Sequence, residues 1–314
     1  MLEHFQSEEH FEDGDTTRVG RNNLHVVSPS ISVSKRIVRL WEYRPLLMSL
    51  IRKELSVKYK NSVLGFVWSM LNPALTLVIY FLVFQLVMKN GIPQFAIFLL
   101  CGLIVWNFFS NAVMSATSSV VANAGIIKKV SFPREVLPLA SVGSSMVFFF
   151  LQGIVLIVAL IIARDVPAFS YLPLLVFAFV DLMILSGALA ILLGAVNVYY
   201  RDTQHLLEII LMAWFWATPV VYPYQLIATS LVHHNLLFLD FINPMTAIII
   251  TFQRVLYAKV SPIGTAHTVV HILPTNSVAW FAGQLTIVLV VSSVLFMIAL
   301  KVFGRMEGNF AEEL

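Results

Sequence analysis

The sequence predicts an all-α polytopic membrane protein with six transmembrane helices, an N-terminal amphipathic interface helix, and outer re-entrant helices between spans five and six. Of the 314 residues, 59% are hydrophobic and only 12% are Asp, Glu, Lys or Arg, whereas about a quarter of a soluble domain is charged. The apolar residues also form long runs, each able to supply the ~20 residues that cross ~30 Å of hydrocarbon. These two observations exclude a soluble globular fold.

Six apolar runs are predicted as membrane spans. Unpaired backbone groups are costly in lipid, and these runs lack the alternation typical of outer-membrane strands, so we predict that all six are helices. Together with their loops they form a transmembrane domain over residues 61–303. The spans lie near residues 64–87, 95–119, 138–163, 171–197, 206–226 and 276–303.

The segments that flank this domain are predicted to be cytoplasmic. Residues 1–34 form an acidic tail, with six acids and no Lys or Arg among the first 15 residues. This composition favours disorder and differs from the basic start of a cleavable signal. Residues 35–60 have apolar side chains at helical spacing and predict an amphipathic interface helix, with a simple basic anchor as the alternative. Residues 304–314 form a second tail.

The distribution of basic residues predicts the orientation. If the N-terminus is cytoplasmic, only four of the 20 Lys and Arg lie outside, namely Lys89, Arg164, Arg254 and Lys259. This asymmetry satisfies the positive-inside rule with both termini in the cytoplasm. The net charge of +3 therefore needs no nucleic-acid partner.

Two segments between the spans are unusual. The loop over residues 123–138 mixes apolar and charged residues, which predicts either a short helix that docks onto a cytoplasmic partner or an ordinary basic loop. The outer segment over residues 227–274 is apolar but interrupted, and stretches such as 241–257 are too short for further crossings. We predict half-inserted, re-entrant helices there, which roof a cavity.

The sequence contains no recognisable catalytic or cofactor motif. It has no P-loop, no paired catalytic acids and a single cysteine, Cys101, so we expect neither an enzyme nor a resident cofactor or metal ion. His267 and His271 are spaced for one helix face, but the Glu of zinc peptidases is missing between them. Metal binding by these histidines is the minor alternative.

Asp181 is the one acid near the middle of a predicted span. We favour a structural aspartate that is hydrogen-bonded to a neighbouring span. A proton-relay or coupling-ion site is the alternative.

Aromatic residues are abundant, with 24 Phe, 9 Tyr and 6 Trp. Flat aromatic faces pack against sugar rings, so clustered aromatics are candidates for lining a pathway. Lipid-facing or belt positions are the alternative. The candidates are Tyr80, Phe84, Trp106, Phe109, Trp214 and Trp216.

Several motifs together resemble one family. Residues 50–73 (LIRKELSVKYKNSVLGFVWSMLNP) resemble the entry to the first span of ATP-binding-cassette type-2 permeases that export polysaccharides, such as O-antigen, teichoic acid, capsule and galactan. The other matching stretches are FLLCGLIVWNFF at 98–109, IKKVSFPREVLP at 127–138, NVYYRDTQHLL at 197–207, TPVVY at 218–222 and NPM at 243–245.

The resemblance implies a homodimer in a bacterial inner or plasma membrane, with two copies of a separate P-loop ATPase that binds ATP and Mg²⁺. The cargo is a lipid-linked polysaccharide, and the outer helices cap a channel lined by aromatic residues. The coupling helix, which contacts the ATPase, maps to Lys128, Lys129, Phe132, Pro133, Arg134 and Glu135.

The diphosphate of a lipid-linked substrate would meet basic residues near the inner leaflet. Arg52, Lys58 and Lys60 are the candidates, and anchoring to anionic lipid is the alternative reading of the same residues. Three rival functions stay open. They are drug or lipid export by the same fold, ion-coupled transport that depends on Asp181, and a membrane-embedded enzyme acting on a lipid-linked substrate.

Overall fold

A computed structural model describes residues 33–60, 67–89, 91–226, 243–258, 262–263 and 270–314. The predicted acidic tail lies outside these residues except for its last two positions, as does most of the outer segment 227–274. The elements are α1 (Val33–Glu42), α2 (Arg44–Tyr59), α3 (Val67–Phe81), the π-helical η1 (Leu82–Val87), α4 (Phe95–Ala122), α5 (Ala124–Ile127), α6 (Val136–Ala163), η2 (Phe169–Tyr171), α7 (Leu172–Tyr199), α8 (Thr203–Trp216), α11 (Pro244–Leu256), β1 (Pro262–Ile263), β2 (Val270–His271), α12 (Val278–Met306), η3 (Glu307–Asn309) and α13 (Phe310–Glu313).

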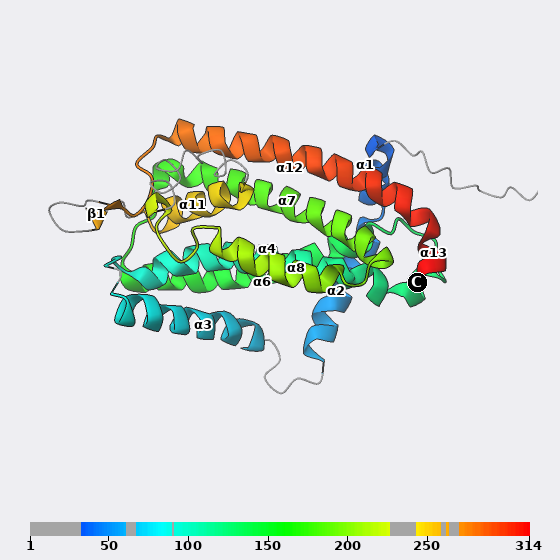
Figure 1. Cartoon of the computed structure of the whole chain (residues 1–314), viewed down its shortest axis with the longest axis horizontal. Helices are drawn as coiled ribbons and strands as arrows, with labels where there is room; N and C mark the ends of the chain where they lie inside the picture. Colours follow the sequence, from blue (N-terminus) through cyan, green and yellow to red (C-terminus); the bar gives the residue numbers. More distant parts are fainter. Residues whose placement is uncertain (1–32, 61–66, 90, 227–242, 259–261, 264–269) are drawn as a thin grey trace, which may run out of the picture.

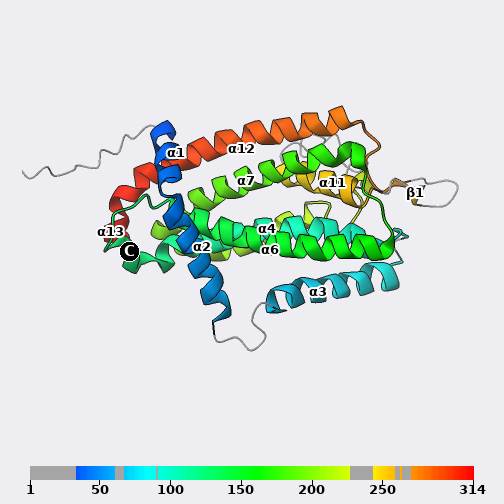
Figure 2. The same cartoon turned by 180° about the vertical axis from the view of Figure 1, so that it is seen from behind.

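Four long apolar helices form the body of the protein. α4, α6, α7 and α12 run side by side (Figures 1 and 2), and each is long and apolar enough to cross a membrane. They confirm the second, third, fourth and sixth predicted spans. In the most apolar window of α4, 78% of the residues are buried, against 22% in α6. α4 is therefore the central helix, and α6 presents most of its surface outward.

The first predicted span is described only from residue 67 on, and the fifth is shorter as a helix. α3 continues into the π-helical η1, and the two together cover residues 67–87. α8 ends at Trp216, ten residues before the predicted end, because Pro219 and Pro223 follow and cannot continue a helix. Crossing of the membrane by these two segments stays a prediction.

α1 and α2 cross the bundle at one end, where α13 also lies (Figures 1 and 2); we call this the basal end. One helix was predicted over 35–60, but the chain bends at Tyr43 and α2 restarts with Pro45 in its first turn. The Glu54 carboxylate of α2 accepts hydrogen bonds from Ser141 and Ser144 of α6, at 2.8 and 2.7 Å. α2 is therefore fixed on α6.

The opposite end carries α11 and a small hairpin. α11 has 13 residues, too few to cross a bilayer, and most of its side chains are buried. The Asn243 side chain caps the N-terminus of this helix, since its Oδ1 accepts a hydrogen bond from the Met245 N–H at 3.1 Å. The same oxygen also accepts a hydrogen bond from Trp214 Nε1 at 2.8 Å. β1 and β2 pair antiparallel, so the described residues are all-α except for this hairpin. His271 lies in β2, so its spacing from His267 does not put it on a helix face; His267 lies outside the described residues.

Candidate functional site

The predicted coupling loop lies at the basal end and exposes a short tip. α4 ends at Ala122, α5 follows, and residues 128–131 are all exposed. Lys53 of α2 donates a hydrogen bond to Asn123 Oδ1 at 2.9 Å, which ties the start of the loop to α2. Phe132 is half-buried and Pro133 is buried. The tip therefore offers two lysines and Val130 to a partner, while the segment behind it packs on the bundle.

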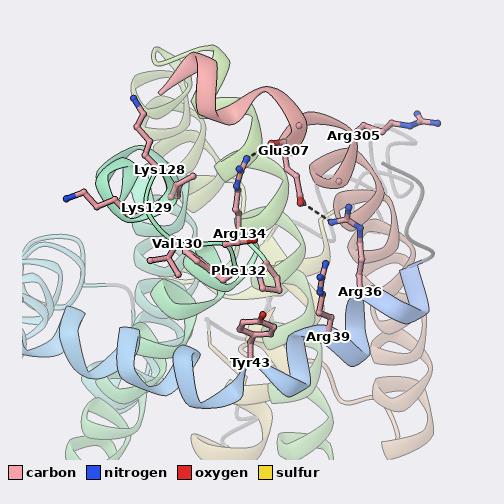
Figure 3. A pocket seen from close by; sticks show the side chains of 15 residues that line it. Arg36, Arg39, Tyr43, Lys128, Lys129, Val130, Phe132, Arg134, Arg305 and Glu307 are labelled. Carbon is pink, nitrogen blue, oxygen red and sulfur yellow. Dashed lines mark hydrogen bonds and ion pairs between the residues drawn. The ribbon is translucent and has the colours of Figure 1, made fainter. Parts of the chain in front are cut away.

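Glu135 points inward and is paired. Its side chain is 2% exposed and forms an ion pair with Arg36 of α1, which is itself 8% exposed. Arg36 also binds Glu307 Oε2 at 3.0 Å (Figure 3). Burial raises the pKa of Glu135, and the nearby charge of Glu307 adds to this, while Arg36 opposes both. Burial lowers the pKa of Arg36, but hydrogen bonds and charges from Glu307 and Glu135 outweigh it and raise the pKa overall.

Arg134 attaches the same loop to the C-terminal turn. It donates a hydrogen bond to the backbone carbonyl of Glu307, and its guanidinium lies 5.8 Å from the ring centroid of Phe310. Phe310 is fully buried and packs edge-on against Phe303 of α12 at 5.3 Å. The C-terminal turn therefore packs against the predicted coupling loop.

A hollow of about 520 Å³ lies between the loop, α1 and the end of α12. In Figure 3, Lys128 and Lys129 project away from the bundle, whereas Arg39 and Tyr43 rise toward the hollow from α1 and its junction with α2. Of the residues that line it, Glu307 is the one acid and is bound to Arg36. The lining is thus basic, and its cations are Arg36, Arg39, Lys128, Lys129, Arg134 and Arg305.

The three diphosphate candidates lie on α2 and just after it. Lys58 Nζ sits 4.3 Å from the ring centroid of Phe148 on α6. Partial burial lowers the pKa of Lys58, and the charge of Glu54 opposes this shift. Arg52, Lys58 and Lys60 are all exposed. Lys58 differs in having an aromatic partner on α6, while all three cations are open to a ligand or to lipid.

The structure brings the aromatic candidates together where α3, α4 and α8 meet. The Phe109 and Trp214 rings are 5.1 Å apart, and Phe215 links Trp106 at 5.5 Å with Tyr80 at 6.0 Å. Phe84 packs against Tyr80 and Phe95, at 6.3 and 5.9 Å. The six candidates differ in accessibility, because Phe109 is fully buried and Trp216 is 50% exposed.

Comparison with known proteins identifies the family. The family described as ABC-2 type transporter matches residues 45–257. The chain belongs to the ABC-2 type transporter family. It is 34% identical over 282 residues to the "O-antigen export system permease protein RfbA" of Myxococcus xanthus, which covers 89% of this chain and 99% of that protein. A protein of the same name from Klebsiella pneumoniae is 30% identical over 269 residues, covering 86% of this chain and 95% of the relative.

This membership confirms the resemblance in the motifs and makes the chain a multi-pass membrane transport subunit. The family match also includes the predicted coupling loop and the α2 lysines, since both lie within residues 45–257. Among the described residues, no group of three or more His, Cys, Asp or Glu is arranged to hold a metal ion.

Asp181 occupies an unusual place in this ABC-2 transporter. It lies on α7, is 0% exposed, and neither carboxylate oxygen has a hydrogen-bond partner within the described part of the chain. The predicted hydrogen bond to a neighbouring span is therefore not present there. Ser292 of α12 is also fully buried, and its hydroxyl likewise has no partner among these residues.

Three residues that line the hollow at the basal end were not predicted from the sequence as part of the site: Arg36, Glu307 and Gly304. Arg36 and Glu307 are 99 and 172 residues from Glu135 along the chain, so no local spacing connects them. One signal exists, because Glu135 is the lone acid of loop 123–138 and directly precedes an apolar run. An acid at such a position requires a cationic partner, but the pattern does not identify which one.

Proposed function

We propose that this chain is the transmembrane subunit of an ABC exporter that moves a lipid-linked polysaccharide across the inner membrane. The near full-length similarity to O-antigen export permeases carries this proposal. An O-antigen type of cargo is favoured over a galactan or teichoic-acid type for the same reason. Two copies of the subunit work with two copies of a separate ATPase, which supplies the ATP and Mg²⁺ sites, and both termini lie in the cytoplasm.

The geometry of the basal end supports docking of the ATPase there. The tip at 128–131 is exposed and basic, and the chain on either side of it is anchored by Lys53 and Glu135. A force applied to the tip therefore reaches α4 and α6 directly, since these helices border the loop. When the ATPase subunits close on ATP, the tip moves, and the two copies open a conduit for the glycan.

Charge reversal at the tip tests this docking. We expect the double variant Lys128→Glu and Lys129→Glu to lower ATPase co-purification or stimulated ATP hydrolysis roughly tenfold, because like charges replace complementary ones at an interface. Lys89→Glu, on the proposed outer side, is the matched control and should leave both quantities unchanged. Unchanged hydrolysis and export in the tip variant would remove the docking assignment.

Substitutions at the α2 lysines test the diphosphate site. Lys60→Gln removes an exposed cation, and we expect it to weaken binding of a lipid-diphosphate glycan about threefold to tenfold. Lys58→Gln is the comparison, since Lys58 is already held against Phe148. Binding to purified protein is measured with the lipid-diphosphate substrate and with an uncharged lipid glycan. Equal affinity of the wild type and of the double variant Lys58→Gln and Lys60→Gln for the diphosphate substrate would contradict the assignment.

Drug or lipid export by the same fold is the closest rival. Vesicles that contain the subunit and its ATPase distinguish the two, because a glycan exporter moves the lipid-linked polysaccharide and an amphiphile exporter moves the free lipid. Export by the subunit alone, without an ATPase, would contradict both readings.

A further inference from the structure

Three segments that are far apart in the sequence meet at a single arginine. Arg36 comes from α1, Glu135 from the start of α6, and Glu307 from the turn after α12. The guanidinium binds both carboxylates, and the three side chains are 8%, 2% and 22% exposed, respectively. We call this group the basal clamp. It joins the loop that carries the exposed tip to the first and last helices of the chain.

The end of α12 is shaped to admit this guanidinium. A Cβ added at Gly304 would overlap the Arg36 guanidinium, well inside van der Waals contact. Gly304 is itself buried on α12, one turn before Glu307. The absence of a side chain at 304 therefore leaves the room in which Arg36 reaches both of its partners.

A second set of contacts ties the same segments together. Arg134, next to Glu135, binds the Glu307 carbonyl and lies over Phe310, while Tyr199 of α7 donates a hydrogen bond to the Met306 carbonyl at 2.8 Å. Glu135 of the clamp is too enclosed to meet a docked protein and Glu307 is only 22% exposed, whereas Lys128 and Lys129 are exposed. The residues of the loop thus divide into an exposed contact surface and a buried attachment.

We propose that Arg36 is a positioning residue for energy coupling, which binds the coupling loop to α1 and α12 so that a displacement of the tip moves all three. This inference rests on the proposed function. Without the clamp, the ATPase would still dock on the tip and hydrolyse ATP, but the loop would lose its link to α1 and would be joined to the end of α12 through Arg134 alone, so less of the motion would reach these helices. The clamp therefore governs how much export each hydrolysed ATP produces and does not govern docking.

Gly304→Ala tests this proposal without changing any charge. The added methyl displaces the end of the Arg36 side chain, while alanine is a better helix former than glycine, so α12 itself is not weakened. Gly308→Ala is the matched control, because a Cβ there meets nothing within 4 Å and Gly308 lines the same hollow. Each variant is reconstituted in vesicles with the ATPase, and co-purification, ATP hydrolysis and glycan export are measured together.

For Gly304→Ala we expect co-purification and hydrolysis close to wild type and a fall of about tenfold in export per ATP, typical of a lost coupling free energy. Gly308→Ala should match wild type in all three quantities. Glu307→Gln provides a second test if Gly304→Ala folds poorly, because it keeps the side-chain shape, is partly exposed and removes one charge of the clamp. Its export per ATP should also fall, and Arg36→Lys, which keeps the charge, should retain more export than Arg36→Gln.

An unchanged ratio of export to hydrolysis in both Gly304→Ala and Glu307→Gln overturns the proposal and leaves the proposed function intact. A fall in ratio that only parallels a loss of thermal stability, with Arg36→Lys no better than Arg36→Gln, also overturns it, because the clamp is then merely structural. If the wild-type chain itself neither retains the ATPase nor exports glycan, the proposed function and this inference fail together.

Discussion

Replacing Glu135 by Ala is expected to lower the free energy of unfolding by about 3 kcal/mol, because it leaves a buried arginine short of its more enclosed partner. The loss should fall at the lower end of the range for broken buried ion pairs, since Glu307 still binds Arg36 at 3.0 Å. Denaturation of the detergent-purified protein measures the effect. Lys129→Ala is the control, since an exposed lysine of the same loop should change stability by less than about 0.5 kcal/mol.

A second variant separates the unpaired charge from the loss of packing. Replacing both partners, with Arg36→Met and Glu135→Leu, removes the more enclosed charge pair, keeps most of the volume and leaves Glu307, which is 22% exposed, to be solvated by water. We expect this double variant to recover most of the stability, because apolar replacements of a buried pair are often neutral or stabilising. If the double variant is as unstable as Glu135→Ala, packing and not the unpaired charge explains the loss.

The long helices were predictable because the membrane imposes a simple rule on the sequence. A helix that crosses hydrocarbon must be apolar over about 20 residues, and α4, α6, α7 and α12 satisfy this without interruption. The predicted end of α8, in contrast, was wrong by ten residues. Hydropathy stays high through residues 217–222, but Pro219 and Pro223 end the helix, so composition and backbone chemistry disagree there and the backbone decides.

The candidate site was predictable only in part. The motif around residues 127–138 predicted the position of the coupling loop through its resemblance to the family, but it did not show that only residues 128–131 of this stretch are exposed. The ion pair of Glu135 could not be predicted from the neighbouring sequence, because its partner Arg36 lies on α1 and the third member of the clamp, Glu307, follows α12. Contacts between residues 99 and 271 positions apart leave no periodic trace, so one sequence does not reveal them.

Replacing Asp181 by Leu is expected to raise the free energy of unfolding by about 2 kcal/mol, the reverse of the effect at Glu135. Both acids are enclosed, but Asp181 has no hydrogen-bond partner at either oxygen within the described part of the chain. A buried polar group without a partner costs roughly 1–3 kcal/mol, and leucine, which has the same number and branching of side-chain heavy atoms but no polar group, removes that cost. Asp181→Asn keeps an unsatisfied polar group and should gain much less, which makes it the matched control in thermal denaturation.

The same pair of variants tests whether Asp181 takes part in transport. If ATP hydrolysis by the partner drives export, both Asp181→Leu and Asp181→Asn should export glycan, and an ATPase-inactive partner should abolish it. An ion-coupled transporter that depends on this carboxylate gives the opposite result, with export lost in both variants and a pH or sodium gradient replacing the need for ATP. A protein that keeps an unpaired acid in its core bears a cost in stability, so loss of export with a gain in stability would indicate that Asp181 is retained for transport.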